Sequence, residues 1–186
     1  MKNFIPEKYH RLTTLTHIFL FLFVYIFILS CNNTPKEPDK INTDDYKAPL
    51  LIANEHMVKV ENEEINNYIK RYEWDMQTTA TGLRYMIYKK GNGKPVNMGD
   101  KVKINYKVKL ITGVVCYTSD DDGALEFLTG KAEVINGLEE AVLLMHEGDR
   151  AKVIIPSHLA YGLLGDEEKI PKRATLIYDI ELLKEF

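Results

Sequence analysis

Side chains that could carry out chemistry are scattered along this sequence. Three consecutive aspartates at 120–122 precede Gly123, as acidic ligands do in some calcium-binding loops. This run lacks the alternating ligands and the distal glutamate of an EF-hand, so it is interpreted as a solvated turn. His146 and His158 are isolated and do not have the paired spacing of metal ligands. The sequence therefore predicts no metal site and contains no recognisable catalytic triad.

Two other side chains could act in a binding pocket. Tyr161 lies beside Gly162 in a predicted turn, where its hydroxyl has hydrogen-bonding capacity to spare. Cys116 could be a redox sensor, but the only other cysteine is Cys31, far away in the sequence. A small, buried apolar role is therefore the favoured interpretation of Cys116.

The elements that must position these residues show two periodicities. Between Val102 and Leu110 every second residue is apolar, and such a period of two predicts a half-buried strand. Leu83, Tyr85 and Ile87 predict another strand, which ends at a glycine-rich turn. Two more strands are predicted at 151–155 and 176–182.

A helical period replaces this alternation at residues 136–148. Leu138, Ala141, Val142 and Met145 recur at helical spacing, and Asn136 is placed to cap the helix. The order of strands, one helix and strands predicts an α+β domain in which an antiparallel sheet wraps a single helix.

A second, N-terminal helix is predicted within residues 56–78. Ile65, Ile69 and Tyr72 recur at helical spacing, with acidic residues first and two basic residues late, which suits the helix dipole. Simple packing against the folded domain is the favoured role for so short a helix. Dimerisation and the holding of client chains are the alternatives.

The first 55 residues lie outside this predicted core. Residues 1–30 contain a cationic flank and the apolar run Ile18–Leu29, which predicts a secretory signal peptide. The run is shorter than the roughly 20 residues of a membrane span. The favoured interpretation is that this segment is cleaved and that Cys31 is then lipidated. The alternatives are an uncleaved membrane anchor and a plain secreted protein. Residues 31–55 are rich in Pro, Asn, Asp and Lys and are predicted to form a disordered tether.

Composition fits one domain with appendages. The chain has 186 residues, of which 45% are hydrophobic. Removal of residues 1–30 would take away three cations and one anion, so the formal charge would fall from −3 to −5. An acidic protein of this kind has no electrostatic route to nucleic acid.

Residues 127–186 contain the segments that identify a family. The segments are FLTGKAEVINGLEEAV, MHEGDRAKVIIP, LAYG and IPKRATLIYDIELLK, in that order. In these segments and their spacing, residues 79–186 resemble the FKBP-type peptidyl-prolyl cis/trans isomerases. The resemblance implies an FKBP-like fold, an aromatic pocket as the active site, and a reaction that requires neither a cofactor nor a metal. It also implies proline-containing polypeptides as substrates.

The N-terminus narrows this resemblance. The sequence ILSC at 28–31 looks like a bacterial lipobox, in which the cysteine, here Cys31, is lipidated and becomes the first mature residue. No aspartate follows Cys31, which by analogy with enteric lipoproteins favours the outer membrane, facing the periplasm. Together with the upstream helix, these features look like the gliding-motility-associated FKBP lipoproteins of Bacteroidetes. The expected clients are then exported envelope proteins, whereas the oligomeric state stays open.

The resemblance also assigns the pocket residue by residue. Tyr106 matches a tyrosine whose ring forms a pocket wall, and Tyr161 matches one whose hydroxyl hydrogen-bonds the substrate. Ile135 lies in the segment whose backbone amide donates to a substrate carbonyl. These three residues are expected to be catalytic. The remaining pocket residues implied by the resemblance are Cys116, Tyr117, Leu125, Phe127, Val134, Leu138, Ile170 and Tyr178.

Departures from the family pattern fall inside this pocket. Cys116 and Tyr117 stand where the family usually has phenylalanine and aspartate, and Leu138 replaces the tryptophan that floors the pocket. The loss of the aspartate removes an acceptor that polarises the site. These changes favour an alternative function, a weakly active or inactive binding and chaperone module of an envelope assembly. The intact EVI and AYG segments favour the enzyme.

Overall fold

The computed structural model describes residues 44–183, so the predicted signal peptide and the lipidation site Cys31 lie outside the described residues. The described elements, in chain order, are α2 (Asp44–Tyr72), β1 (Gln77–Thr78), β2 (Arg84–Lys89), β3 (Lys101–Leu110), β4 (Val115–Thr118), α3 (Ser119–Asp122), β5 (Leu125–Leu128), α4 (Asn136–Leu143), β6 (Arg150–Ile155), a 3-10 turn (Ser157–Leu159) and β7 (Leu176–Leu182).

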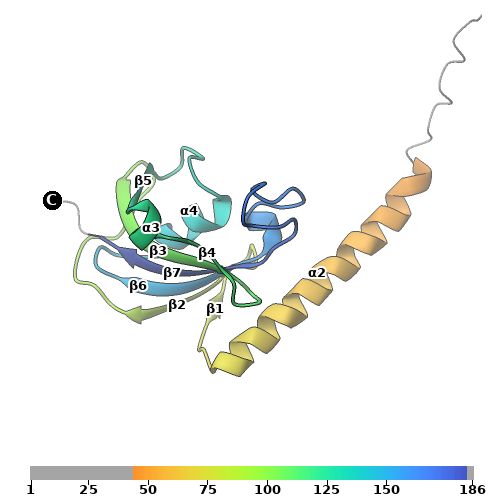
Figure 1. Cartoon of the computed structure of the whole chain (residues 1–186), viewed down its shortest axis with the longest axis horizontal. Coiled ribbons are helices and arrows are strands. Elements are labelled where there is room, and N and C mark those ends of the chain that lie inside the picture. The colour runs from red at the N-terminus through yellow and green to blue at the C-terminus, as the bar shows by residue number, and fades with distance from the viewer. Residues whose placement is uncertain (1–43, 184–186) are drawn as a thin grey trace, which may run out of the picture. The chain divides into compact units, whose positions relative to one another are not determined.

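One antiparallel sheet contains all of these strands. The strand order is β1-β2-β6-β7-β3-β4, and β5 pairs with the first half of β3 on the edge that β4 uses further along. The alternation predicted for β3 is confirmed, because Val102, Ile104 and Val108 are buried whereas the lysines between them are mostly exposed. Figure 1 shows α4 lying against one face of the sheet, so the predicted α+β class is confirmed.

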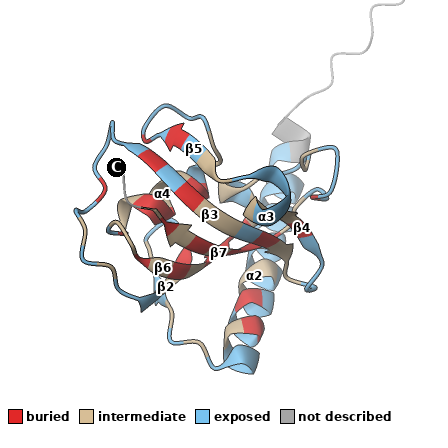
Figure 2. Ribbon diagram, turned by 60° about the vertical axis from the view of Figure 1, so that its left-hand side comes forward, coloured by how far each residue is buried: buried red, intermediate tan, exposed pale blue. Residues whose placement is uncertain are grey.

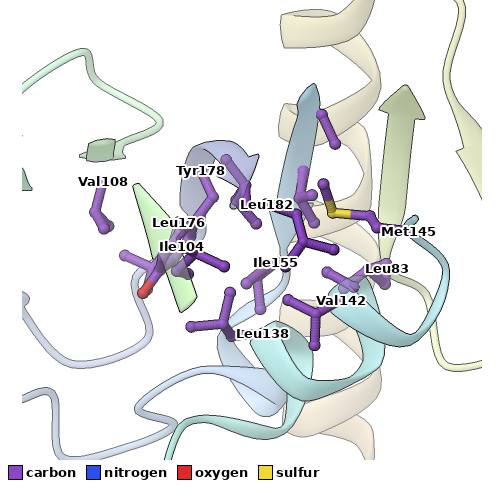
Figure 3. Packing of buried hydrophobic residues seen from close by; sticks show 14 of the residues in the cluster. Leu83, Ile104, Val108, Leu138, Val142, Met145, Ile155, Leu176, Tyr178 and Leu182 are labelled. Carbon is purple, nitrogen blue, oxygen red and sulfur yellow. The ribbon is translucent and has the colours of Figure 1, made fainter. Parts of the chain in front are cut away.

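Helix α4 packs tightly against the centre of the sheet. Leu138, Ala141 and Val142 are buried, as their helical spacing predicts, and Figure 3 shows Leu138 and Val142 close to Ile155 of β6. A Cβ atom added at Gly137 would lie 2.3 Å from Ile155 Cγ2. Only glycine therefore lets the first turn of α4 approach β6 this closely.

The predicted cap of α4 is wrong in its position. Ile135, not Asn136, is the N-cap residue, and it makes no side-chain capping bond. Asn136 already lies in the first helical position, where its side chain cannot reach the amides that need a partner. The Glu139 carboxylate instead accepts a hydrogen bond from the Ala132 backbone N–H at 3.0 Å, outside the helix.

Helix α2 is longer than the sequence pattern suggests. It begins at Asp44, within the predicted tether of residues 31–55, and ends at Tyr72, before the predicted limit of residue 78. Every side chain from residue 47 to residue 60 is exposed, so burial does not hold this part in a helix. Residues 50–60 include leucine, alanine, glutamate, methionine and lysine, whose helix propensity extends the helix from its docked half.

The C-terminal half of α2 packs against the sheet. Ile65 and Tyr68 form a buried cluster with Ile154 and Ile177 on the face of the sheet, and Figure 2 shows the buried positions of α2 gathered toward its C-terminal end. The Glu61 carboxylate accepts hydrogen bonds from Ser157 and Thr175, whose side chains belong to the folded domain. Within residues 44–183, no helix has the length and apolar composition needed to cross a membrane.

We expect Ile65→Ala to lower the free energy of unfolding by about 2–4 kcal/mol, because Ile65 is 0% exposed and its truncation leaves a cavity. Urea unfolding followed by the fluorescence of the single tryptophan, Trp74, measures this change, since Trp74 packs on the Tyr68 ring. The control is Ile52→Ala on the same helix, where the side chain is 69% exposed. It is expected to change stability by less than about 0.5 kcal/mol. Equal effects of the two substitutions would contradict the docked arrangement.

Candidate functional site

A cavity of about 290 Å³ opens between the sheet and the N-terminal end of α4. Strands β3, β4, β5 and β7 each contribute walls, and the turn after the 3-10 helix contributes Tyr161. The lining residues are Tyr106, Val108, Tyr117, Leu125, Glu133, Val134, Ile135, Leu138, Tyr161 and Tyr178.

The structure brings eight of the eleven predicted pocket residues to this cavity and leaves three outside it. Cys116, Phe127 and Ile170 are buried in the main core instead. Val108 and Glu133 line the cavity although the sequence analysis did not single them out. The alternation of β3 predicted that Val108 points inward, but alternation alone cannot separate the wall of a pocket from the core.

Tyr106 is held at a break in the strand pairing of β3. Strand β5 pairs with Lys101–Ile104 and β4 pairs with Lys107–Lys109, so the edge beside Tyr106 has no strand partner. The Tyr106 N–H donates instead to the Ser119 hydroxyl at 3.2 Å. The short helix α3 thus satisfies the backbone at the point where the Tyr106 ring enters the cavity. The aspartates of α3 form an exposed single turn, and no group of three or more potential metal ligands lies together within residues 44–183.

Strand β5 carries Leu125 to the cavity and is tied to β3 by charge. Glu126 forms salt bridges with Lys101 at 2.9 Å and Lys103 at 2.6 Å, both from β3. Hydrogen bonds from these two lysines lower the pKa of Glu126 to about 2. The salt bridges between β3 and β5 therefore stay charged throughout the physiological pH range.

Two hydrogen-bond donors in the cavity wall have no protein partner in the part of the chain that the structure describes. The Ile135 N–H precedes the first turn of α4, where backbone amides are left without intrahelical acceptors. The Tyr161 hydroxyl belongs to a side chain that is 37% exposed. A bound carbonyl oxygen could accept from either group, and the positive end of the α4 dipole favours an oxygen at Ile135.

The cavity is rich in tyrosine hydroxyls. Burial raises the pKa of Tyr106, and the Asp122 carboxylate raises it further. Burial, followed by the charge of Asp166, likewise raises the pKa of Tyr161. Burial also raises the pKa of Tyr178, which lies within electrostatic range of both of these tyrosines. The three phenols therefore stay protonated at neutral pH and remain hydrogen-bond donors.

Asp166 supplies a carboxylate that the sequence analysis missed. The Tyr117 hydroxyl donates to Asp166 Oδ2 at 2.5 Å, and the Glu168 and Ile170 amides donate to Oδ1 at 2.9 and 2.7 Å. Tyr117 stands where the family pattern has aspartate, so this chain holds a carboxylate beside the cavity by a different route. No sequence signal pairs residues 49 positions apart.

The loop that contains Asp166 also contacts the buried Cys116 side chain. The Cys116 thiol lies 3.7 Å from the Lys169 carbonyl oxygen, inside the core rather than at the cavity. Burial raises the pKa of this thiol, so it stays protonated and poorly reactive. Lys169 in turn places its ammonium group 4.5 Å from the centre of the Tyr117 ring.

Known proteins resemble this chain in sequence and in fold. A sequence profile described as FKBP-type peptidyl-prolyl cis-trans isomerase matches residues 92–183. The chain is 40% identical over 109 residues to the probable FKBP-type peptidyl-prolyl cis-trans isomerase FkpA of Neisseria meningitidis, covering 59% of this chain and 40% of that protein. It is 34% identical to the macrophage infectivity potentiator of Trypanosoma cruzi, covering 65% of this chain and 67% of that protein.

A solved structure agrees with these sequence matches. The crystal structure of FkpA from Escherichia coli superposes with a TM-score of 0.59 and 31% identity, covering 80% of this chain and 73% of that one. An antiparallel sheet packed around one short helix is the FKBP fold. The chain belongs to the FKBP-type peptidyl-prolyl cis/trans isomerase family. It spans less than half the length of the Neisseria relative.

We expect Tyr117→Phe to raise the pKa of Asp166 toward the ordinary aspartate value. Burial alone would raise this pKa, but the hydrogen bonds from Tyr117 and the loop amides outweigh burial and lower it. Because the folded-state pKa is lowered, these bonds stabilise the protein above the ordinary aspartate pKa. Their contribution is lost as the pH falls through the lowered value. An NMR titration of the Asp166 carboxyl carbon measures the shift.

The matched control for this titration is Tyr88→Phe, which removes a hydroxyl that donates to Asp179 on the sheet. It is expected to leave the Asp166 titration unchanged. An Asp166 pKa that does not move in Tyr117→Phe would show that the loop amides alone hold the carboxylate.

Proposed function

We propose that this protein catalyses cis/trans isomerisation of prolyl bonds in exported polypeptides of the bacterial envelope. The observation that carries the proposal is the pair of donors, the Ile135 N–H and the Tyr161 hydroxyl, that have no partner among residues 44–183. Both lie in the wall of the cavity whose other walls are aromatic and aliphatic. Proline-containing exported polypeptides are the proposed substrates.

The reaction requires a pocket of suitable shape rather than reactive groups. Rotation about an Xaa-Pro bond breaks amide resonance, with a barrier of about 18–20 kcal/mol, so the uncatalysed step takes tens of seconds or longer. A pocket lowers the barrier when it binds the twisted amide more tightly than either planar form. A thousandfold acceleration requires only about 4 kcal/mol of such differential binding.

Each wall of the cavity has a part in this scheme. The Tyr106 and Tyr178 rings and the Leu125 side chain surround the proline ring and exclude water from it. The Ile135 N–H donates to the carbonyl oxygen nearest the proline, and the Tyr161 hydroxyl donates to a second carbonyl of the same chain. These bonds hold the flanking peptide units while the bond between them rotates.

We expect Tyr161→Phe to reduce kcat/KM for a short Xaa-Pro peptide by about 2- to 12-fold, the effect of one hydrogen bond worth about 0.5–1.5 kcal/mol. Tyr161→Ala, which also removes the ring, is expected to cost more, and Ile135→Ala is expected to reduce the rate by loosening the start of α4. Exchange NMR on residues 32–186 measures the rates. Tyr88→Phe, a tyrosine outside the cavity, is the control.

The same assay tests the second candidate function, a binding and chaperone module with little turnover. The observation that favours it is the floor of the cavity, where Leu138 replaces the tryptophan of the family pattern and is almost completely buried. A folded domain that accelerates no peptide, whatever residue precedes proline, would leave only this module. In that case the partners are to be sought among envelope assemblies, and the gliding apparatus is the candidate that the narrower resemblance names.

We further propose that a lipid on Cys31 holds the protein at the outer membrane, facing the periplasm. The lipobox-like sequence at 28–31 supports the lipid anchor, and the lack of an aspartate directly after Cys31 supports the outer membrane. We expect wild-type protein produced in its bacterial host to partition into the detergent phase of Triton X-114, whereas Cys31→Ser stays in the aqueous phase and keeps its signal peptide. Mass spectrometry of the N-terminus reads out the lipid directly. An unmodified, membrane-free mature protein would overturn the anchor but not the isomerase.

A further inference from the structure

A second and larger cavity of about 590 Å³ lies on the other side of the Tyr161 turn. Tyr161 lines the pocket described above, and the next two residues, Gly162 and Leu163, line this second cavity. Consecutive Cα atoms are 3.8 Å apart, so the walls of the two cavities are neighbouring residues of one loop. The Leu163 side chain is 69% exposed and offers an apolar surface beside the second cavity. The two cavities are therefore close enough for one extended polypeptide chain to reach both.

An arginine without an ion-pair partner lines this second cavity. The Arg84 side chain is 7% exposed, and its guanidinium donates to the Gly82 carbonyl oxygen and to Asn62 Oδ1, the latter at 2.9 Å. Its Nε–H has no partner, and no carboxylate of the described chain lies within 4 Å of the guanidinium. Burial lowers the pKa of Arg84, and the more distant Glu61 charge only partly opposes this effect. A buried cation that lacks a counter-charge is unfavourable unless an anion approaches it.

The cavity lining also contains a second arginine and a carboxylate that already accepts hydrogen bonds. Arg173 is half-buried, lines the cavity, and forms no ion pair within residues 44–183. Its backbone N–H donates to the Gly162 carbonyl oxygen at 2.7 Å, which fixes it beside the Tyr161 turn. Glu61 is the one carboxylate among the lining residues, and its oxygens already accept three hydrogen bonds from Ser157 and Thr175. The cavity therefore has a net positive lining.

We propose that this cavity is a second substrate subsite, which binds an aspartate or glutamate side chain of the polypeptide whose prolyl bond occupies the first pocket. The inference rests on the proposed isomerase function and deepens it. Arg173 donates to the bound carboxylate, and Arg84 contributes its charge from the buried side of the cavity. Because neighbouring residues of one loop line the two cavities, we place the acidic side chain within a few residues of the proline.

A peptide series tests the subsite. Peptides of about ten residues carry one proline and place Glu, Gln or Lys at each of the second, third and fourth positions on either side of it. Isomerisation and dissociation constants are measured for each peptide by NMR. At one of these positions, we expect Glu to lower KM and the dissociation constant by about tenfold relative to Gln, with kcat unchanged, and Lys to raise both constants. Equal constants for Glu and Gln at every position would overturn the proposal.

Neighbouring residues provide matched variants. Arg173→Gln is expected to abolish the difference between the Glu and Gln peptides. Lys172→Gln removes the same charge from the adjacent residue, which does not line this cavity, and is expected to retain the difference. Loss of the difference in both variants would indicate a general charge effect and overturn the subsite. Arg84→Met tests whether the buried charge contributes to the difference between the Glu and Gln peptides. Its result is interpreted only after urea unfolding shows that the variant is folded.

Failure of this inference and failure of the isomerase proposal give different results. If the Gln peptides are isomerised but the Glu peptides gain nothing, only the subsite is wrong. If no peptide is isomerised, the enzyme proposal is wrong, and the dissociation constants still report whether the cavity selects a carboxylate. Competition by free glutarate or inorganic phosphate without any preference among the peptides would identify a small-anion site and overturn the proposal for substrate binding.

Discussion

The close approach of α4 to strand β6 is the constraint on which the rest of the structure depends. Gly137 permits this approach, because any side chain there would overlap Ile155. The same contact sets the depth at which Leu138 floors the pocket and the position of the Ile135 N–H at its wall. The main core and the candidate site thus share one packing arrangement, and a change that lifts the helix would disturb both.

The candidate site combines aromatic walls with a small number of hydrogen-bond donors, which is the composition that prolyl isomerisation requires. Its departures from the family pattern compensate one another in part. Tyr117 replaces a family aspartate, and its hydroxyl, at the cavity, donates a short hydrogen bond to the Asp166 carboxylate. Tyr178 adds a further phenol hydroxyl to the cavity lining. The cavity lining is therefore rich in hydroxyl groups, while its two proposed substrate donors remain available.

The two halves of helix α2 are stabilised in different ways. Its C-terminal half is held by burial of Ile65 and Tyr68 and by the hydrogen bonds of Glu61, so it belongs to the folded domain. Its exposed half depends on local propensity and on continuity with that docked half. Because α2 also supplies Glu61 and Asn62 to the second cavity, its docking extends the surface available to a substrate beyond the first pocket.

The sequence by itself determined four strands, β2, β3, β6 and β7, and the presence of helices α2 and α4, because local periodicity reports which face of a strand or helix is buried. The inward residues of β3 and the buried face of α4 follow directly from the apolar pattern. The resemblance over residues 79–186 likewise indicated the family and eight residues of the cavity. Only the tertiary structure decided that Phe127 and Ile170 are core. It alone also revealed the Tyr117–Asp166 bond and the cavity beside Arg84. These features depend on contacts between distant residues or on long-range packing, which no local pattern encodes.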